Sequence, residues 1–306
     1  MVDRSEALSA RLLSAQWMSR SNNITQQFMD LGVKTISMAG GLPAAEFYPV
    51  EAIAAAAQQA IGRWGPSMLE YGPIEGFPAL RQHISERISR QTGRTFTADN
   101  VLLSTGSMQA LDLLGKVLID PGDRIVAQFP TYVGALDAWR PRLPLYDLID
   151  WSDQGRTTVD SLRKAKFVYT VPNYSNPTGA LVPAHSRQVL LEKVIQAGTW
   201  LVEDDPYLPL QFDGESGPSI LALHGRMEPD GPYDGPVIYL GTLSKSIVPG
   251  LRVGWTVASN RMIRALALAK QSSNCWRPAS RPRMYRRSCD TTGSAAMRSV
   301  TPPVPI

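Results

Sequence analysis

Apolar residues recur along this chain at two spacings, and segments of the two kinds alternate between residues 77 and 255. Phe77, Leu80, Ile84 and Ile88 follow one another at intervals of three or four residues, which predicts a helix with one apolar face. Short apolar runs bounded by polar or turn residues predict strands at 101–103, 124–127, 167–170, 200–203, 237–240 and 253–257. Because helices and strands alternate, the fold class that we expect is α/β, with a mostly parallel sheet and helices on both faces.

A second helix is predicted from Leu190, Val194 and Ala197, which share one helical face. Gly198 follows them and suits the left-handed conformation in which many helices end. The polar run 152–158 comes after prolines at 141 and 144. We interpret the segment 141–158 as a surface connection.

A chain of 306 residues with 43% hydrophobic content can bury a sizeable core and hold one large domain or two ordinary ones. No apolar stretch approaches the length of a membrane span. The charged residues Asp3, Arg4 and Glu6 do not fit a secretory signal. Cys275 and Cys289 both lie beyond residue 270, so the body of the chain has no cysteine for a disulfide. We therefore expect a cytoplasmic protein.

The formal net charge of +4 is concentrated near the C-terminal end. Residues 271–306 hold six arginines and one acidic residue, which leaves 25 of the 31 basic and 26 of the 27 acidic residues in 1–270. The body of the chain is thus near neutral, and no basic stripe with interleaved aromatic residues runs through it. This pattern disfavours a nucleic-acid partner.

The loop between the last two predicted strands carries Lys245 and Arg252, seven positions apart, with Thr242 and Ser244 beside the lysine. Taken alone, a lysine without an acidic neighbour in sequence is normally a surface charge. Strand edges, however, are where open α/β sheets bind ligands. An amine beside an arginine at such an edge predicts a Schiff-base lysine next to a phosphate-binding group.

Three more polar motifs follow predicted strands. Ser107 opens a helix, so its hydroxyl and the backbone N–H groups form an anion cradle at the positive helix end, although a Gly-Ser turn is often only a cap. Asn176 begins an Asn-Pro-Thr-Gly turn, which any Asn-Pro pair favours. Asp204 and Tyr207 have a spacing that suits two groups on one ligand edge, whereas Asp205 is expected to be solvated.

These motifs together resemble those of a known family. Residues 241–255, GTLSKSIVPGLRVGW, resemble the lysine motif of the class I/II aminotransferases, pyridoxal 5'-phosphate (PLP) enzymes of fold type I, most closely the 2-aminoadipate aminotransferase-like branch. The resemblance covers about residues 36–270. It implies an N-terminal segment at 1–35, a PLP-binding large domain with a mostly parallel mixed sheet at 36–258, and the start of an interdomain helix at 259–270.

The resemblance also implies roles for single residues. Lys245 would be the catalytic lysine, which holds PLP and moves the α-proton of the amino acid. Asp204 would pair with the protonated pyridine nitrogen, while Asn176 and Tyr207 would bond the phenolic oxygen. Tyr132 would stack on the pyridine face.

The same resemblance implies that the phosphate group is bound by Ser107, Met108, Thr242, Ser244 and Arg252. Met108 stands where the family carries a glutamine. If the contact is made by the backbone N–H, that departure costs little.

Two further residues resemble family positions outside the strand-end motifs. Tyr71 resembles a tyrosine that crosses a dimer interface to the neighbour's phosphate, which implies a homodimer. Gly41 lies in a substrate-side glycine turn and would let the ligand approach the backbone. Residues 21–26 hold no arginine to bind an acidic side chain. We therefore expect a neutral substrate, an apolar or aromatic amino acid.

The pattern changes after residue 270. Ser259 and Asn260 can cap a helix, but 271–306 shows no helical or strand period and is rich in proline, arginine and serine. Such a composition buries too little apolar area to offset its ordering entropy, which predicts a disordered tail. Our hypothesis is a frameshifted or wrongly ended reading frame, so that the small domain and its substrate-binding arginine are missing and transamination is weak.

Three functions stay open on the sequence alone. The first is a PLP-dependent aminotransferase that uses an amino acid and a 2-oxo acid. The second is a PLP-binding module without turnover, as in regulators that attach such a domain to a DNA-binding one, although no helix-turn-helix segment precedes Val33. The third is a PLP-dependent lyase. No metal site is predicted.

Overall fold

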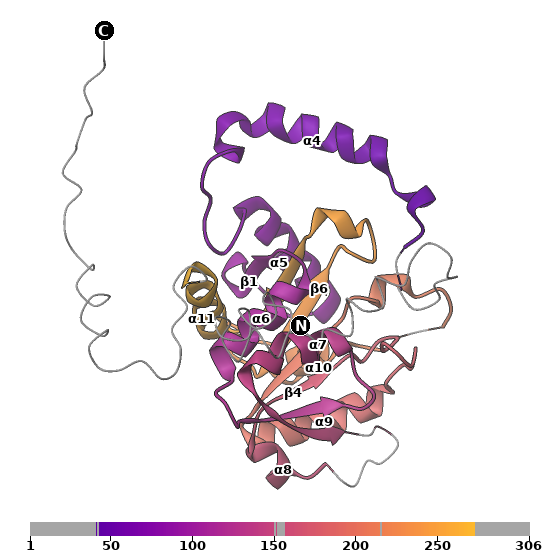
Figure 1. The fold of residues 1–306 in the computed structure, drawn as a ribbon, viewed down its shortest axis with the longest axis vertical. Helices are drawn as coiled ribbons and strands as arrows, with labels where there is room; N and C mark the ends of the chain where they lie inside the picture. Colours follow the sequence, from indigo (N-terminus) through magenta and orange to yellow (C-terminus); the bar gives the residue numbers. More distant parts are fainter. Residues whose placement is uncertain (1–40, 42, 150, 152–156, 215, 273–306) are drawn as a thin grey trace, which may run out of the picture. The chain divides into compact units, whose positions relative to one another are not determined.

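The computed structural model describes residues 41, 43–149, 151, 157–214 and 216–272. The chain divides into two units, Met1–Lys270 and Gln271–Ile306, and every described strand lies in the first. Within the described residues the strands form one sheet in the order β1-β7-β6-β5-β4-β2-β3 (Figure 1). The strands are β1 (Val101–Ser104), β2 (Arg124–Gln128), β3 (Leu145–Ile149), β4 (Ala165–Thr170), β5 (Trp200–Asp204), β6 (Val237–Thr242) and β7 (Gly254–Val257).

Strand β7 is antiparallel to both of its neighbours, and all other neighbouring strands pair in parallel. The sheet is therefore mixed and mostly parallel, as predicted. Every residue of β6 and β7 is buried, and such continuous burial is typical of strands that are covered on both faces.

Two helical layers cover the sheet (Figure 1). Apolar side chains of α6, α7 and α11 pack on one face, and those of α5, α8, α9 and α10 pack on the other. The described helices are α4 (Val50–Trp64), α5 (Pro78–Thr92), α6 (Ser107–Leu118), α7 (Val133–Trp139), α8 (Val159–Arg163), α9 (Ala184–Ala197), α10 (Ile220–Met227) and α11 (Asn260–Gln271). Short 3-10 turns also occur at Ala45–Phe47, Gly65–Met68, Ala98–Asn100, Arg140–Arg142, Leu208–Leu210 and Pro249–Leu251.

The predicted helices are confirmed, and the helix boundaries that the sequence marks at Ser107, Gly198 and Ser259 lie where it places them. Ile84 and Ile88 of α5 are buried. Gly198 ends α9 in the left-handed region with a φ of 68°, and its N–H donates to the carbonyl oxygen of Val194. Ser259 starts α11, because its hydroxyl accepts the N–H of Met262.

The prediction of a surface connection at 141–158 was wrong over Leu145–Ile149, which form β3. This strand lies at the edge of the sheet and pairs only with β2. Asp147 interrupts its apolar residues, so the strand lacks the continuous apolar run that identified the others, and Leu145 and Leu148 remain exposed. Residues 150 and 152–156 lie outside the described residues, as do the predictions for 1–35 and 273–306.

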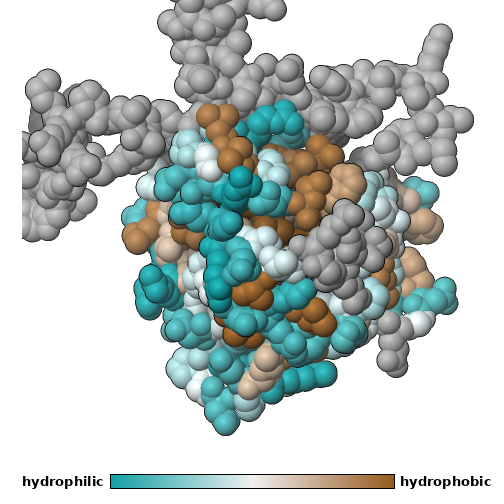
Figure 2. All heavy atoms as spheres, turned by 90° about the horizontal axis from the view of Figure 1, so that it is seen from below, coloured by the Kyte–Doolittle hydropathy of each residue, from teal (hydrophilic) through white to brown (hydrophobic). Residues whose placement is uncertain are grey.

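The surface of the described residues carries both hydrophobic and hydrophilic side chains. Figure 2 shows a face on which hydrophobic residues gather in part of the surface and hydrophilic residues cover the rest. None of the described helices combines the length and the apolar character that crossing a membrane requires.

Candidate functional site

The carboxyl ends of the parallel strands meet at one edge of the sheet, and the predicted motifs follow them. The residues placed in this way are Ser107 after β1, Tyr132 after β2, Asn176 after β4, Asp204 at the end of β5 and Lys245 after β6. Because β7 runs in the opposite direction, Arg252, which precedes it, reaches the same edge. The topology therefore gathers motifs that are far apart in the sequence.

Lys245 lies against the predicted substrate-side glycine. Its Nζ donates a hydrogen bond of 2.8 Å to the carbonyl oxygen of Gly41, and Gly41 has a φ of 53°, in the region that favours glycine. Burial lowers the pKa of the Lys245 ammonium, because leaving water disfavours the charged form. A lowered pKa suits an amine that acts as a nucleophile or a base near neutral pH.

Arg252 joins the lysine loop to the start of α6. Its guanidinium donates to Ser244 Oγ and to the carbonyl oxygen of Thr105, each at 3.3 Å. The first N–H groups of a helix have no partner within the helix. The guanidinium and these N–H groups together form a cradle for an anion such as phosphate.

Two glycines make this cradle possible. Gly106 has a φ of 82°, and a Cβ there would collide with the guanidinium of Arg252. A Cβ on Gly254 would lie 2.7 Å from the carbonyl carbon of Gly106 and 2.8 Å from the nitrogen of Ser107. The starts of β7 and α6 thus approach each other with no room for a side chain.

Thr242 fixes the loop that carries the lysine. Its Oγ1 lies 3.0 Å from the carbonyl oxygen of Val253 and accepts the N–H of Ser244 at 3.1 Å. The hydroxyl of Ser244 lies 3.0 Å from the same Oγ1. Thr242, Ser244 and Arg252 are therefore linked by hydrogen bonds, as a shared role at one phosphate would require.

Asp204 is a buried carboxylate with one unused oxygen. Only 2% of the residue is exposed. Its Oδ2 accepts a hydrogen bond of 2.8 Å from the Tyr169 hydroxyl, whereas its Oδ1 is buried without a partner. Burial raises the pKa of Asp204 to about 7. A buried oxygen of this kind is suited to an N–H donor, and a cationic donor would favour its charged form.

The remaining predicted side chains lie around Asp204. The Tyr132 hydroxyl donates to Met108 Sδ at 3.6 Å, and burial, followed by the charge of Asp204, raises the pKa of Tyr132 to about 12. Burial also raises the pKa of Tyr207, against a side-chain hydrogen bond from Asn176 that lowers it. The two aromatic residues and the carboxylate therefore interact electrostatically.

Tyr71 is the predicted site residue that was assigned to a contact between subunits. Its side chain is fully exposed. The proposed contact with a neighbouring subunit stays a prediction.

Sequence reasoning missed Tyr169, which orients Asp204. Its ring packs edge-on against Trp139 in the core, and its hydroxyl donates to Asp204. A tyrosine among apolar neighbours is a weak signal, because its ring alone accounts for burial.

The expectation that Asp205 is solvated was wrong, since only 3% of it is exposed. Its Oδ1 accepts from Asn173 Nδ2 at 2.9 Å, and its Oδ2 accepts from the Tyr239 hydroxyl at 3.1 Å. The preceding Glu203 is also buried, and its two carboxylate oxygens accept the N–H groups of Ile220 and Leu221 at the start of α10. The donors come from distant segments, so the local run of acids gives no sign of them.

The sequence profile of class I and II aminotransferases matches residues 34–287, most of the chain. The chain belongs to the class I and II aminotransferase family. The match extends past residue 270, where the sequence analysis set the end of the resemblance.

Two curated relatives illustrate the similarity. The chain is 38% identical over 248 residues to aromatic-amino-acid aminotransferase 1 of Thermococcus litoralis, covering 78% of this chain and 57% of the relative. It is 37% identical over 249 residues to the 2-aminoadipate transaminase of Thermus thermophilus, covering 79% and 60%. The chain therefore spans only about 60% of the length of these relatives.

A solved structure shows the same fold. The α-aminoadipate aminotransferase LysN of Thermus thermophilus, complexed with N-(5'-phosphopyridoxyl)-L-leucine, superposes with a TM-score of 0.74 at 34% identity, covering 89% of this chain and 67% of that chain. The fold type I prediction is thus confirmed.

The residues at this edge of the family fold fit PLP. The unpartnered Oδ1 of Asp204 suits a protonated pyridine nitrogen, and the glycine-lined cradle beside Arg252 suits a phosphate. Lys245 supplies an amine of lowered pKa between them. In the part of the chain that the structure describes, no group of three or more histidine, cysteine, aspartate or glutamate side chains is placed to hold a metal ion.

Proposed function

We propose that this chain is a PLP-dependent aminotransferase, which moves an amino group between a neutral amino acid and a 2-oxo acid. The observation that carries the proposal is the buried, unpartnered Oδ1 of Asp204 at the same sheet edge as Lys245 and Arg252. These three groups correspond to the pyridine nitrogen, the aldehyde carbon and the phosphate of PLP.

When bound, PLP withdraws electrons from the α-carbon of the amino acid. Asp204 holds the ring nitrogen protonated through a charge-assisted hydrogen bond, and Tyr169 holds Asp204 in place. Lys245 supplies the amine that takes the α-proton at its Nζ and returns it. Its lowered pKa increases the fraction that is neutral and able to accept a proton.

The other site residues bind and orient. Arg252 and the N-terminal N–H groups of α6 fix the phosphate. Tyr132 would cover one face of the ring, while Asn176 and Tyr207 would contact its phenolic oxygen. Holding the ring by its two ends aligns it with the amine of Lys245, and such alignment can supply several kcal/mol of barrier lowering.

The substrate class rests on charge. Among the described residues, the candidate site holds one arginine, Arg252, which the proposal assigns to phosphate. A second carboxylate on the substrate would have no arginine of its own there, which favours an apolar or aromatic amino acid. The similarity to an aromatic-amino-acid aminotransferase supports the same class. The single arginine also leaves the α-carboxylate weakly held, so we expect slow turnover.

A homodimer in the cytoplasm is part of the proposal. The fully exposed Tyr71 is suited to a contact with a second subunit. The aminotransferases to which the chain is similar support a soluble location.

The test is chemical labelling. The chain is incubated with PLP, reduced with borohydride, digested and mapped by mass spectrometry. We expect the pyridoxyl group on Lys245, and a Lys245→Ala chain should carry none. A label on Lys270, whose Nζ is bound by the carbonyl oxygens of Ile74 and Leu103, would contradict the assignment.

Product analysis separates the alternatives. An aminotransferase converts the amino acid to its 2-oxo acid and leaves pyridoxamine phosphate, whereas a lyase releases ammonium or carbon dioxide. A PLP-binding module without turnover would take the label and form no product. The single arginine among the described residues of the site favours that module as the second candidate.

A further inference from the structure

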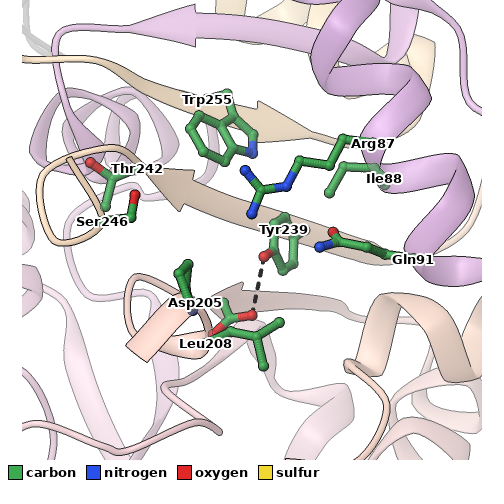
Figure 3. Close-up of a pocket in the computed structure, with 10 residues that line it drawn as sticks. Arg87, Ile88, Gln91, Asp205, Leu208, Tyr239, Thr242, Ser246 and Trp255 are labelled. Carbon is green, nitrogen blue, oxygen red and sulfur yellow. Dashed lines mark hydrogen bonds between the residues drawn. The ribbon is translucent and has the colours of Figure 1, made fainter. Parts of the chain in front are cut away.

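A second cavity lies behind the lysine loop, on the opposite face of the sheet from Asp204. It has a volume of about 150 Å³, and its lining includes Arg87, Asp205, Tyr239, Ser246 and Trp255. Tyr239 and Trp255 pack with the core under α5, α9 and α10, whereas the strand neighbours of Tyr239 pack under α6, α7 and α11. The cavity, drawn in Figure 3, thus lies on the other face of the sheet from Asp204 and shares Thr242 with the candidate cofactor site.

Trp255 presents an unsatisfied donor to this cavity. The residue is 6% exposed, and its Nε1 is buried with no hydrogen-bond partner. Gly241 makes room for the ring, since a Cβ there would collide with the indole. Buried N–H donors without an acceptor are rare in folded proteins, so an acceptor is expected at this point.

Arg87 adds a positive charge beside the same point. It reaches the cavity from α5, and in Figure 3 its guanidinium lies between the indole nitrogen of Trp255 and the ring of Tyr239. Among the described residues Arg87 makes no ion pair and no side-chain hydrogen bond. Two groups that can only donate therefore face each other, and neither can satisfy the other.

Among the described residues, Asp205 lines the same cavity but forms no ion pair with Arg87. Its two oxygens already accept from Asn173 and from the hydroxyl of Tyr239, and burial raises its pKa. Tyr239 directs its proton to Asp205, as the dashed line in Figure 3 marks. The cation and the indole N–H of the cavity are left for an external acceptor.

We propose that this cavity binds a small oxyanion, a carboxylate or a phosphate, between the guanidinium of Arg87 and the indole N–H of Trp255. The Ser246 hydroxyl lies at the cavity wall and can donate a third hydrogen bond. A cavity of about 150 Å³ holds a molecule of roughly the size of benzene, which suits such an anion. Since Ser246 follows Lys245, the anion would bridge α5, β7 and the lysine loop.

The site is independent of the proposed function, because its residues differ from those assigned to PLP, apart from Thr242 at one end of the cavity. Inorganic phosphate would also enter the cradle of Arg252, so the experiment must tell the two apart. The chain has seven tryptophans, which give few enough indole N–H resonances to follow individually by ¹⁵N NMR.

The full chain is titrated with phosphate and, in a second arm, with acetate, at an ionic strength held constant with sodium chloride. We expect the Trp255 indole resonance, assigned with Trp255→Phe, to shift and saturate with at least one of the two anions, which also identifies the preferred class. Arg87→Gln should weaken binding at least tenfold. Arg90→Gln, which removes an exposed charge from the same helix, should leave it unchanged.

The background variant Arg252→Gln removes the phosphate cradle and should keep the saturable shift of Trp255. Loss of the shift in that variant would place the anion in the cradle and overturn the proposal. The absence of saturation with both anions, which would mean water alone occupies the cavity, or an equal weakening by Arg90→Gln would overturn it as well.

Discussion

Replacing Asp204 by asparagine should change stability and cofactor binding in opposite directions. Asp204→Asn keeps the shape and still accepts the Tyr169 hydroxyl, but it cannot become charged. In the folded chain burial raises the pKa of Asp204 from 3.8 to about 7. The native state thus holds this proton more tightly than the unfolded chain. The resulting stabilisation is complete below pH 4 and is lost as the pH rises through about 7.

The difference between 3.8 and about 7 corresponds to roughly 4 kcal/mol, which is the folding stability that the parent has lost at pH 8, where Asp204 is ionised in both the folded and the unfolded chain. Asparagine cannot ionise and so avoids this loss of stability. Its amide N–H groups, however, would be buried without an acceptor, which destabilises the folded chain by about 1–3 kcal/mol. Asp204→Asn should therefore be more stable than the parent by about 1–3 kcal/mol at pH 8. At pH 5 the folded carboxyl is still neutral, but the unfolded one is already ionised, so about 1–2 kcal/mol of the stabilisation has been lost and the variant should match the parent within about 1.5 kcal/mol.

Urea unfolding of the PLP-free chains at pH 5 and pH 8 measures this difference, which should favour the variant more strongly at pH 8. PLP titration of the same chains should show an affinity lowered at least tenfold in Asp204→Asn, because asparagine cannot hold the pyridine nitrogen protonated. The control is Asp205→Asn, whose single amide oxygen can accept from only one of the two donors, Asn173 and Tyr239. This variant should be destabilised at both pH values, with PLP affinity near that of the parent. A stability difference that is independent of pH, or an Asp204→Asn chain that binds PLP like the parent, would refute the reasoning.

Three further substitutions test the site. Tyr169→Phe removes the hydrogen-bond donor to the carboxylate of Asp204. It should weaken PLP binding about 2- to 10-fold, as expected for a hydrogen bond of about 0.5–1.5 kcal/mol. Tyr239→Phe, on the other sheet face, should bind PLP like the parent in the same titration. Gly254→Ala should lower the free energy of unfolding by about 1–3 kcal/mol, measured in urea, whereas Gly250→Ala has nothing within 4 Å of its added Cβ and should not. Arg252→Lys keeps the charge but loses the planar fork, so PLP titration should show weaker binding while pyridoxal, which has no phosphate, binds unchanged.

The sequence predicted those parts of the fold in which burial leaves a local pattern. Strands β4 and β6 are covered on both faces and appear as apolar runs, and α5 shows its buried face at Ile84 and Ile88. Strand β3 pairs along one side only and keeps Leu148 exposed. Its existence depends on β2, which no local pattern records.

The candidate site likewise contains residues that local motifs predict and residues that only the folded structure reveals. Lys245, Arg252 and Asp204 follow strands within motifs that can be seen in sequence. Tyr169 and the burial of Asp205 depend on contacts across strands, with Asp204 and with Tyr239. Such contacts are fixed by strand order and register, which the motifs do not contain.

The reversed direction of β7 makes one hairpin responsible for both cations of the site. Thr242 pairs with Gly254 across β6 and β7, and Gly254 also pairs with Ser104 on β1. A slip of one residue in this ladder would turn every β7 side chain to the opposite face and replace the glycine at the narrow contact by a bulkier neighbour. After such a slip, the amine of Lys245 and the guanidinium of Arg252 could not contact the same ligand. Binding of PLP to Lys245 therefore depends on the register of this hairpin. Formation of the covalent bond between PLP and Lys245 would report that β1, β6 and β7 had paired in the correct register.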